Sequence, residues 1–269
     1  MNRSPIVAGQ FYPGQPAALA GLVAKYLGAA VKKDAEPTIL AMVPHAGYPY
    51  SGPVCGAVLA QANLADRILL LGPNHTGRGA RLSLWPDGAW NIPGGAVPVD
   101  ERTASALLAA EPALTPDRDA HLGEHSLEVI LPFLRALNPD VSIIPLCVSE
   151  HNPQRLLGAA ENMADVLAGL DHPVSIVVSS DMSHYVSREE AETLDALALE
   201  RVEALDPEGL YRTVRQNGVT MCGVLPMTLG LAMANRLGAS KARIAAYATS
   251  GDATGDYRQV VGYAGAIVS

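Results

Sequence analysis

Four residues that can bind a metal ion or transfer a proton follow apolar segments of the sequence. His45 comes after the segment ILAMV and a proline, His75 follows LLLGPN, and Asp181 and His184 follow VSIVVSS. Continuous apolar runs of this length are typical of strands buried on both faces of a sheet. Open α/β sheets bind ligands outside the carboxyl ends of their strands, so these residues are predicted to lie at a ligand-binding edge.

Two of these residues, His45 and His75, have the chemistry of metal ligands. Neutral imidazole is the commonest protein ligand of transition metals, and two of them leave room for a third donor. Cys222 is a candidate third donor, because it stands at the start of a predicted apolar helix, whose dipole favours a thiolate. The alternative is a buried and inert cysteine, the kind that Cys55 and Cys147 are expected to be.

Asp181 and His184 are spaced as i and i+3 and have the chemistry of a proton-transferring pair. An aspartate beside a histidine can orient the ring and raise its basicity; the alternative is a turn-capping aspartate with an exposed histidine. His125 stands at a predicted helix start, where the dipole keeps imidazole neutral and able to donate a hydrogen bond to an oxygen. A plain capping role is its alternative. The other histidines lie in predicted polar loops and are assigned no role (His121, His151 and His172).

Strands and helices alternate along the chain. Strands are predicted at 39–43, 68–71, 82–85, 141–146, 174–178, 243–249 and 260–268. Helices are predicted at 16–27, 54–62, 100–110, 126–137, 153–170, 187–205 and 221–237, and 115–124 is expected to be a surface loop. This alternation predicts one α/β domain over residues 1–269, with a mostly parallel or mixed sheet covered on both faces.

The composition argues against several classes of protein. The chain has 269 residues and a formal net charge of −8, which does not suit a nucleic-acid-binding surface. No apolar run reaches the ~18 residues of a membrane span, and the N-terminus lacks the apolar core of a secretory signal. Three widely separated cysteines do not make a disulfide framework, so a reducing, cytoplasmic location is expected. The segment GPNHTGRG lacks the Gly-Lys-Ser/Thr ending of a phosphate-binding loop, which sets nucleotide binding aside.

Five motifs in order resemble the Memo family: VPHAGYPYSG, LLLGPNHTG, EHSLEVILPFL, VVSSDMSHY and MCGVLPM. Bacterial and archaeal members are often labelled the B protein of the AmmeMemoRadiSam system, beside an AMMECR-like protein and a radical-SAM protein. The resemblance therefore implies a functional link to those two proteins. The family is similar in fold to the class III extradiol (LigB-type) non-haem iron dioxygenases, which implies a three-layer α/β/α domain around a mixed sheet.

The resemblance also implies roles for the candidate residues. His45, His75 and Cys222 would form the metal triad, with cysteine in place of the carboxylate of the dioxygenases. His184 would match their acid/base histidine. His125 and Asp181 would line the same pocket.

These features lead to an enzyme hypothesis with two alternatives. The enzyme hypothesis is an oxidoreductase that acts on a small phenolic or enolic substrate with a bound divalent transition metal. Fe(II) is the expected metal, and Cu or Zn are the alternatives. Tyr48, Tyr50 and Tyr185 are expected to wall the pocket. The alternatives are a non-catalytic module that binds metal or a peptide in the same cleft, and a zinc-dependent hydrolase.

Overall fold

A mixed β-sheet runs through the centre of the molecule. The computed structural model describes residues 1–28 and 33–269. Its strands follow the order β10-β11-β1-β8-β2-β7-β3-β6, with β9 paired to β11 and a separate β4–β5 hairpin. The strands are β1 (Leu40–Val43), β2 (Arg67–Pro73), β3 (Leu82–Leu84), β4 (Ala89–Ile92), β5 (Gly95–Pro98), β6 (Thr115–Pro116), β7 (Ser142–Val148), β8 (Ser175–Ser179), β9 (His184–Val186), β10 (Ala242–Thr249) and β11 (Val260–Val268).

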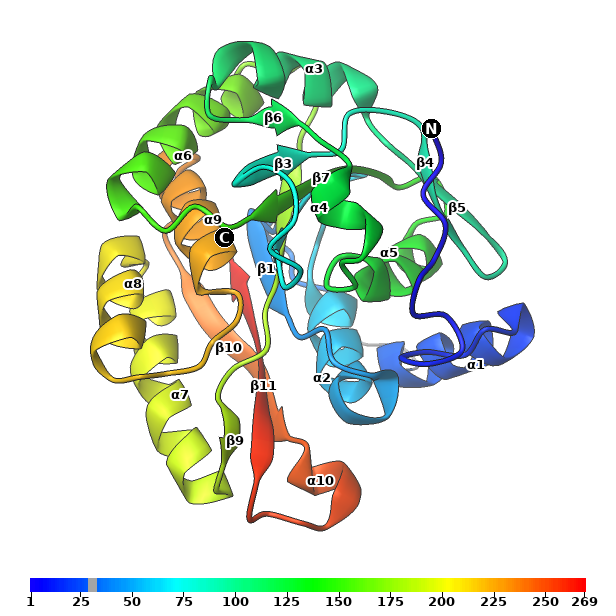
Figure 1. The fold of residues 1–269 in the computed structure, drawn as a ribbon, viewed down its shortest axis with the longest axis vertical. Coiled ribbons are helices and arrows are strands. Elements are labelled where there is room, and N and C mark those ends of the chain that lie inside the picture. The colour runs from blue at the N-terminus through cyan, green and yellow to red at the C-terminus, as the bar shows by residue number, and fades with distance from the viewer. Residues whose placement is uncertain (29–32) are drawn as a thin grey trace.

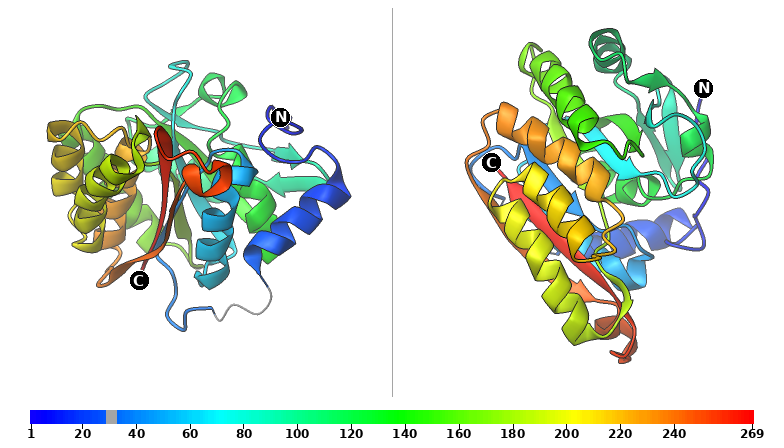
Figure 2. Two further views of the ribbon diagram at one scale, coloured as in Figure 1. Left: turned by 90° about the horizontal axis from the view of Figure 1, so that it is seen from below. Right: turned by 60° about the vertical axis from the view of Figure 1, so that its left-hand side comes forward.

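Helices cover both faces of this sheet (Figure 1). They are α1 (Pro16–Leu27), α2 (Tyr48–Gln61), α3 (Glu101–Ala110), α4 (Asp119–Leu122), the 3₁₀ helix η1 (Glu128–Ile130), α5 (Leu131–Leu137), α6 (Pro153–Ala168), α7 (Arg188–Glu203), α8 (Pro207–Gln216), α9 (Val224–Arg236) and α10 (Gly251–Thr254). Helices α3, α6, α7, α8 and α9 pack on one face, and α1, α2 and α5 pack on the other. In the left view of Figure 2 the strands lie between these two groups. The predicted three-layer α/β/α fold is confirmed.

Alternating side chains explain why the central strands are apolar throughout. In β1, Leu40 and Met42 pack into the core that contains α6 and α9, whereas Ala41 and Val43 pack into the core that contains α1 and α2. Successive side chains of a strand point to opposite faces, so a strand covered on both sides is apolar at every position. The continuous apolar runs of the sequence are therefore two-sided core strands.

The segment 115–124 is not the surface loop that the sequence predicts. It contains β6 and α4, and His121 and Glu124 within it are buried. His121 Nε2 lies 2.9 Å from the carbonyl oxygen of Ser83, and its Nδ1 lies 3.4 Å from Cys147 Sγ. The prediction was wrong because polar side chains that are paired in the interior leave no hydrophobic pattern in the sequence.

The helices formed by the described residues are all too short or too polar to cross a lipid bilayer.

Gly56 allows α2 to lie directly against the end of α1. A Cβ atom at position 56 would lie 2.5 Å from the carbonyl oxygen of Tyr26, and a backbone atom cannot rotate away as a side chain can. A Cβ atom at Gly21, on the exposed side of α1, would meet no described atom within 4 Å apart from its chain neighbours and its own helix backbone. The two glycines therefore differ in whether a methyl group fits.

We predict that Gly56→Ala lowers the free energy of unfolding by about 1–3 kcal/mol, because the two helices have to move apart. Gly21→Ala should raise it by about 0.5–1 kcal/mol, since alanine favours the helix interior. Urea unfolding of both variants beside the wild type measures the difference. Equal effects of the two substitutions would contradict the close approach of α1 and α2.

Candidate metal centre

Three neighbouring parallel strands bring candidate site residues to one edge of the sheet. Strand β8 lies between β1 and β2 and pairs in parallel with both. His45 stands two residues beyond β1, His75 two residues beyond β2, and Asp181 two residues beyond β8. Because the carboxyl ends of parallel strands share an edge, residues far apart in sequence become neighbours there.

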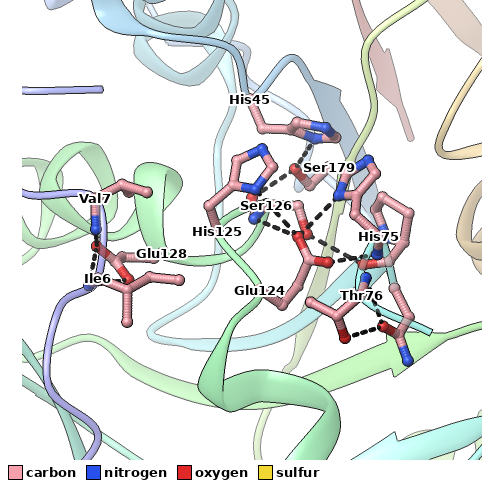
Figure 3. A network of polar contacts seen from close by, with 12 residues as sticks. Ile6, Val7, His45, His75, Thr76, Glu124, His125, Ser126, Glu128 and Ser179 are labelled. Atoms are coloured by element: carbon pink, nitrogen blue, oxygen red, sulfur yellow. Dashed lines mark hydrogen bonds and ion pairs between the residues drawn. The ribbon is translucent and has the colours of Figure 1, made fainter. Parts of the chain in front are cut away.

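Three histidines gather at this edge (Figure 3). One ring nitrogen from each of His45, His75 and His125 lies within 4.8 Å of the other two. His125 comes from the turn before η1, so it does not open a helix as predicted. Burial nevertheless lowers its pKa, so the expected neutral ring follows from desolvation. Imidazole nitrogens suit divalent transition metals, and this cluster has the donors to hold one.

Glu124 fixes the orientation of the His75 ring. Its Oε1 lies 2.9 Å from His75 Nδ1, and its Oε2 accepts the backbone N–H of His75 at 2.5 Å. Burial opposes ionisation of Glu124, but the hydrogen bonds and charge of His75 outweigh burial and bring the pKa of Glu124 to about 2. An ionised carboxylate can only accept hydrogen bonds. His75 Nδ1 therefore carries the hydrogen, and when the ring is neutral its Nε2 has a free lone pair.

Ser179 has the same effect on His45. The Ser179 hydroxyl donates to the carbonyl oxygen of Ser126 at 2.7 Å, so its oxygen accepts from His45 Nδ1, which is also 2.7 Å away. Burial holds the pKa of His45 well below its ordinary value, and the neighbouring His75 and His125 add to this effect. His45 is therefore neutral near pH 7, with the hydrogen on Nδ1 and a free lone pair on Nε2.

Cys222 lies against the histidine cluster. Its Sγ is 3.4 Å from His45 Nε2 and accepts the backbone N–H of Asp181 at 3.2 Å. The residue lies two positions before α9 and not within the helix, which begins at Val224 and not at the predicted Met221. Burial, followed by the charge of Asp181, raises the pKa of the thiol, so the expected effect of the helix dipole is outweighed. Coordination to a metal ion would remove the thiol proton, because a coordinating thiol is deprotonated.

Asp181 and His184 take separate partners instead of forming the predicted pair. Asp181 Oδ1 accepts the backbone N–H of His45 at 2.7 Å. His184 Nδ1 lies 3.1 Å from the carbonyl oxygen of Thr220, whose hydroxyl accepts the His184 backbone N–H at 2.7 Å. Thr220 therefore orients the His184 ring and leaves its Nε2 able to accept a proton. The i, i+3 spacing misled the prediction because the chain turns the Asp181 carboxylate toward β1.

The three tyrosines predicted to wall a pocket have different environments. Tyr48 is a core residue, because its hydroxyl donates to the carbonyl oxygen of Val129 and its ring packs on Phe133. Tyr50 and Tyr185 are exposed, at 43% and 75%. Tyr185 also has a φ of +59°, a left-handed conformation that is strained for a large side chain. Tyr50 and Tyr185 therefore have side chains free to contact a ligand.

Three residues that orient the histidines were not among the predicted site residues (Glu124, Ser179 and Thr220). Each orients a histidine that is distant along the chain, so only the fold shows the contact. Two of them could have been suspected from the sequence because they are close to candidate residues. Glu124 directly precedes His125, and Thr220 stands two residues before Cys222. Orienting groups of this kind usually accompany histidine ligands.

The strand topology and the histidine cluster define an α/β protein with a candidate metal centre at the carboxyl edge of its central strands. A family model described as Memo-like protein matches residues 3–267. The MEMO1 family protein MK0963 of Methanopyrus kandleri is 39% identical, and a MEMO1 family protein of Aquifex aeolicus is 41% identical, each match covering 98% of both chains. The chain belongs to the Memo-like family.

A solved structure has a similar fold. The uncharacterized protein JW3007 from Escherichia coli K12 matches with a TM-score of 0.55 and 12% sequence identity, over 84% of this chain and 98% of that chain. At this identity the similarity shows the fold alone.

We predict that Glu124→Gln weakens binding of Zn(II) about 10–100-fold, because a carboxamide holds the His75 ring less firmly than a carboxylate does. Competition with a chelating dye measures the affinity. Glu111→Gln is the matched control, since Glu111 is also buried and accepts hydrogen bonds, from Ala113 and Asn162. Unchanged affinity in Glu124→Gln, or the same loss in both variants, would contradict the orienting role.

Proposed function

We propose that the chain binds one divalent transition metal ion and acts as a non-haem iron oxidoreductase on a small phenolic or enolic substrate. The proposed ligands are His45, His75 and Cys222. The observation that carries the proposal is the pair of ring orientations fixed by Glu124 and Ser179, with the Cys222 thiol beside them. Fe(II) is the proposed metal, and Cu or Zn are the alternatives because a thiolate is softer than a carboxylate.

Ring geometry favours Cys222 over His125 as the third ligand. A metal ion bound to imidazole lies in the plane of the ring, along the lone pair of the nitrogen. The rings of His75 and His125 are stacked with only 17° between their planes, so their lone pairs converge poorly on one ion. Cys222 Sγ, by contrast, lies within contact distance of His45 Nε2. His125 is proposed to donate a hydrogen bond to an oxygen of the bound substrate.

The remaining residues are proposed to handle the substrate and its proton. Bound iron would supply the redox chemistry with dioxygen. His184 would accept the substrate proton at Nε2, because the Thr220 carbonyl oxygen keeps the hydrogen on Nδ1. Asp181 would hold the backbone of His45 in place through its 2.7 Å hydrogen bond.

Three further expectations stay predictions. A peptide in place of a small molecule is the alternative ligand. The functional link to AMMECR-like and radical-SAM proteins and the cytoplasmic location rest on the sequence.

Thiol accessibility tests the ligand set. We predict that Cys222 alone loses reactivity toward an alkylating reagent when Zn(II) is added, because coordination shields the sulfur. Cys55 and Cys147 are fully buried and should react slowly with or without metal. Mass spectrometry of the alkylated peptides measures each site. Protection of all three cysteines to the same degree would indicate general tightening of the fold and would argue against ligation.

Dioxygen uptake tests the enzyme hypothesis. The protein is reconstituted anaerobically with Fe(II) and mixed with oxygen and a panel of catechols. We predict uptake by the wild type and a loss of about 10²–10⁴-fold in His184→Ala, the usual contribution of a general base. His184→Ala should keep its full iron content, since His184 is outside the ligand set.

The control is His151→Ala, at an exposed histidine that contacts Arg215. This variant should keep both its iron and its uptake. Iron binding without uptake for every catechol would favour the non-catalytic module, and loss of iron from His184→Ala would make His184 a ligand.

A further inference from the structure

Tyr263 is a buried tyrosine on β11, close to the level of the candidate metal centre. Strand β11 runs antiparallel to β1, and Met42 lies opposite Ala266. The chain preceding Ala266 therefore continues beside the segment that leads from β1 to His45. Tyr263 is three residues before Ala266 and His45 is three residues after Met42, so this register brings the two to similar heights.

The chain beyond β8 is tied to β11 at the same place. Gly262 donates its backbone N–H to the carbonyl oxygen of Ser183 at 2.8 Å and accepts the backbone N–H of Met182 at 2.9 Å. These two residues directly follow Asp181. The residue next to Tyr263 is therefore bonded to the segment that follows Asp181.

The hydroxyl of Tyr263 has an unusual environment for a buried tyrosine. The side chain is only 2% exposed, yet among the described residues the hydroxyl makes no hydrogen bond. Buried tyrosine hydroxyls usually find a partner. The hydroxyls of the buried Tyr12 and Tyr48 do so, with Glu128 and the Val129 carbonyl oxygen as acceptors.

This hydroxyl reaches accessible space. The enclosed polar side-chain atoms that lack a partner in the described part of the chain belong to Trp90, Arg118 and Ser183. Tyr263 is not among them, so its unpaired oxygen is open to a water molecule or a ligand.

The groups around this hydroxyl belong to the candidate site. Burial raises the pKa of Tyr263, and the charge of Asp181 and the nearby Tyr50 and Tyr185 add to this effect. The phenol is therefore protonated at neutral pH and acts as a hydrogen-bond donor. Tyr50 and Tyr185 are both exposed.

We propose that Tyr263 donates a hydrogen bond from its hydroxyl to an anionic oxygen of the molecule that binds beside the metal ion. The inference rests on the proposed metal centre and specifies the chemistry of its ligand: an oxyanion such as a phenolate or enolate, carried on a body that Tyr50 and Tyr185 can contact. Tyr263 thus takes the place in the pocket that the sequence assigned to Tyr48. It acts as a specificity-determining residue.

The test uses Zn(II)-loaded protein, because zinc is redox-inert and allows binding to be measured without turnover. The probe is 4-nitrocatechol, whose absorbance changes when its oxygens ionise and bind a metal. Tyr263→Phe should bind this probe about 10–100-fold more weakly, since a hydrogen bond to a charged acceptor is lost. Its zinc content and thermal stability should match the wild type, because the deleted hydroxyl has no hydrogen-bond partner in the part of the chain that the structure describes.

Two controls separate this role from a structural one. Tyr211→Phe removes a hydroxyl that donates to the His151 carbonyl oxygen, and it should bind the probe normally. Imidazole, a neutral metal ligand without an oxygen, should bind Tyr263→Phe and the wild type equally.

Each other outcome overturns either the proposed function or the proposed role of Tyr263. Wild-type protein that binds no zinc overturns the proposed function itself. Wild type that binds zinc but not nitrocatechol, or Tyr263→Phe that binds nitrocatechol normally, overturns only the inference about Tyr263. Equal weakening of nitrocatechol and imidazole overturns it as well, because the effect would then be on the metal.

Discussion

The parallel pairing of β8 with β1 on one side and β2 on the other is the constraint on which the candidate site depends. It places His45, His75 and Asp181 at one edge of the sheet, although the first and last are more than a hundred residues apart. The pairing is stable because every residue of β1 and β8 is buried between two layers of helices. A shift of one residue in register would turn each side chain to the opposite face, so the core and the site are fixed together.

Glu124, Glu128 and Arg3 beneath the site are buried but paired, which is the condition for keeping charge inside a protein. Glu124 accepts hydrogen bonds from the ring and backbone of His75 and from the backbone of Ser126. Its own carbonyl oxygen accepts from Arg3, which also forms a buried ion pair with Glu128 at 2.6 Å. Figure 3 shows Glu128 holding the N–H groups of Ile6 and Val7 beside this network. The N-terminal segment therefore supports the loop that orients His75.

The sequence predicts the fold better than the contacts within the site. Two-sided apolar strands and amphipathic helices leave a strong pattern, so the layers, β1, β2, β8 and β11 could be predicted. Helix α8 and the β4–β5 hairpin were missed because their apolar residues are too few to form a long periodic pattern. Within the site, residues that follow strands could be found, but their partners could not. His184 contacts Thr220 and not Asp181, and Tyr48 lies in the core. Both arrangements depend on how segments that are distant in the sequence meet in the fold.

A crystal grown with zinc and measured at the zinc absorption edge would locate the bound ion and its ligands. We predict one strong anomalous peak per chain, about 2.0–2.1 Å from the Nε2 atoms of His45 and His75 and about 2.3 Å from Cys222 Sγ. A peak bound through Nδ1 of either histidine would contradict the orientation set by Glu124 and Ser179. A peak away from these three residues would contradict the metal centre itself.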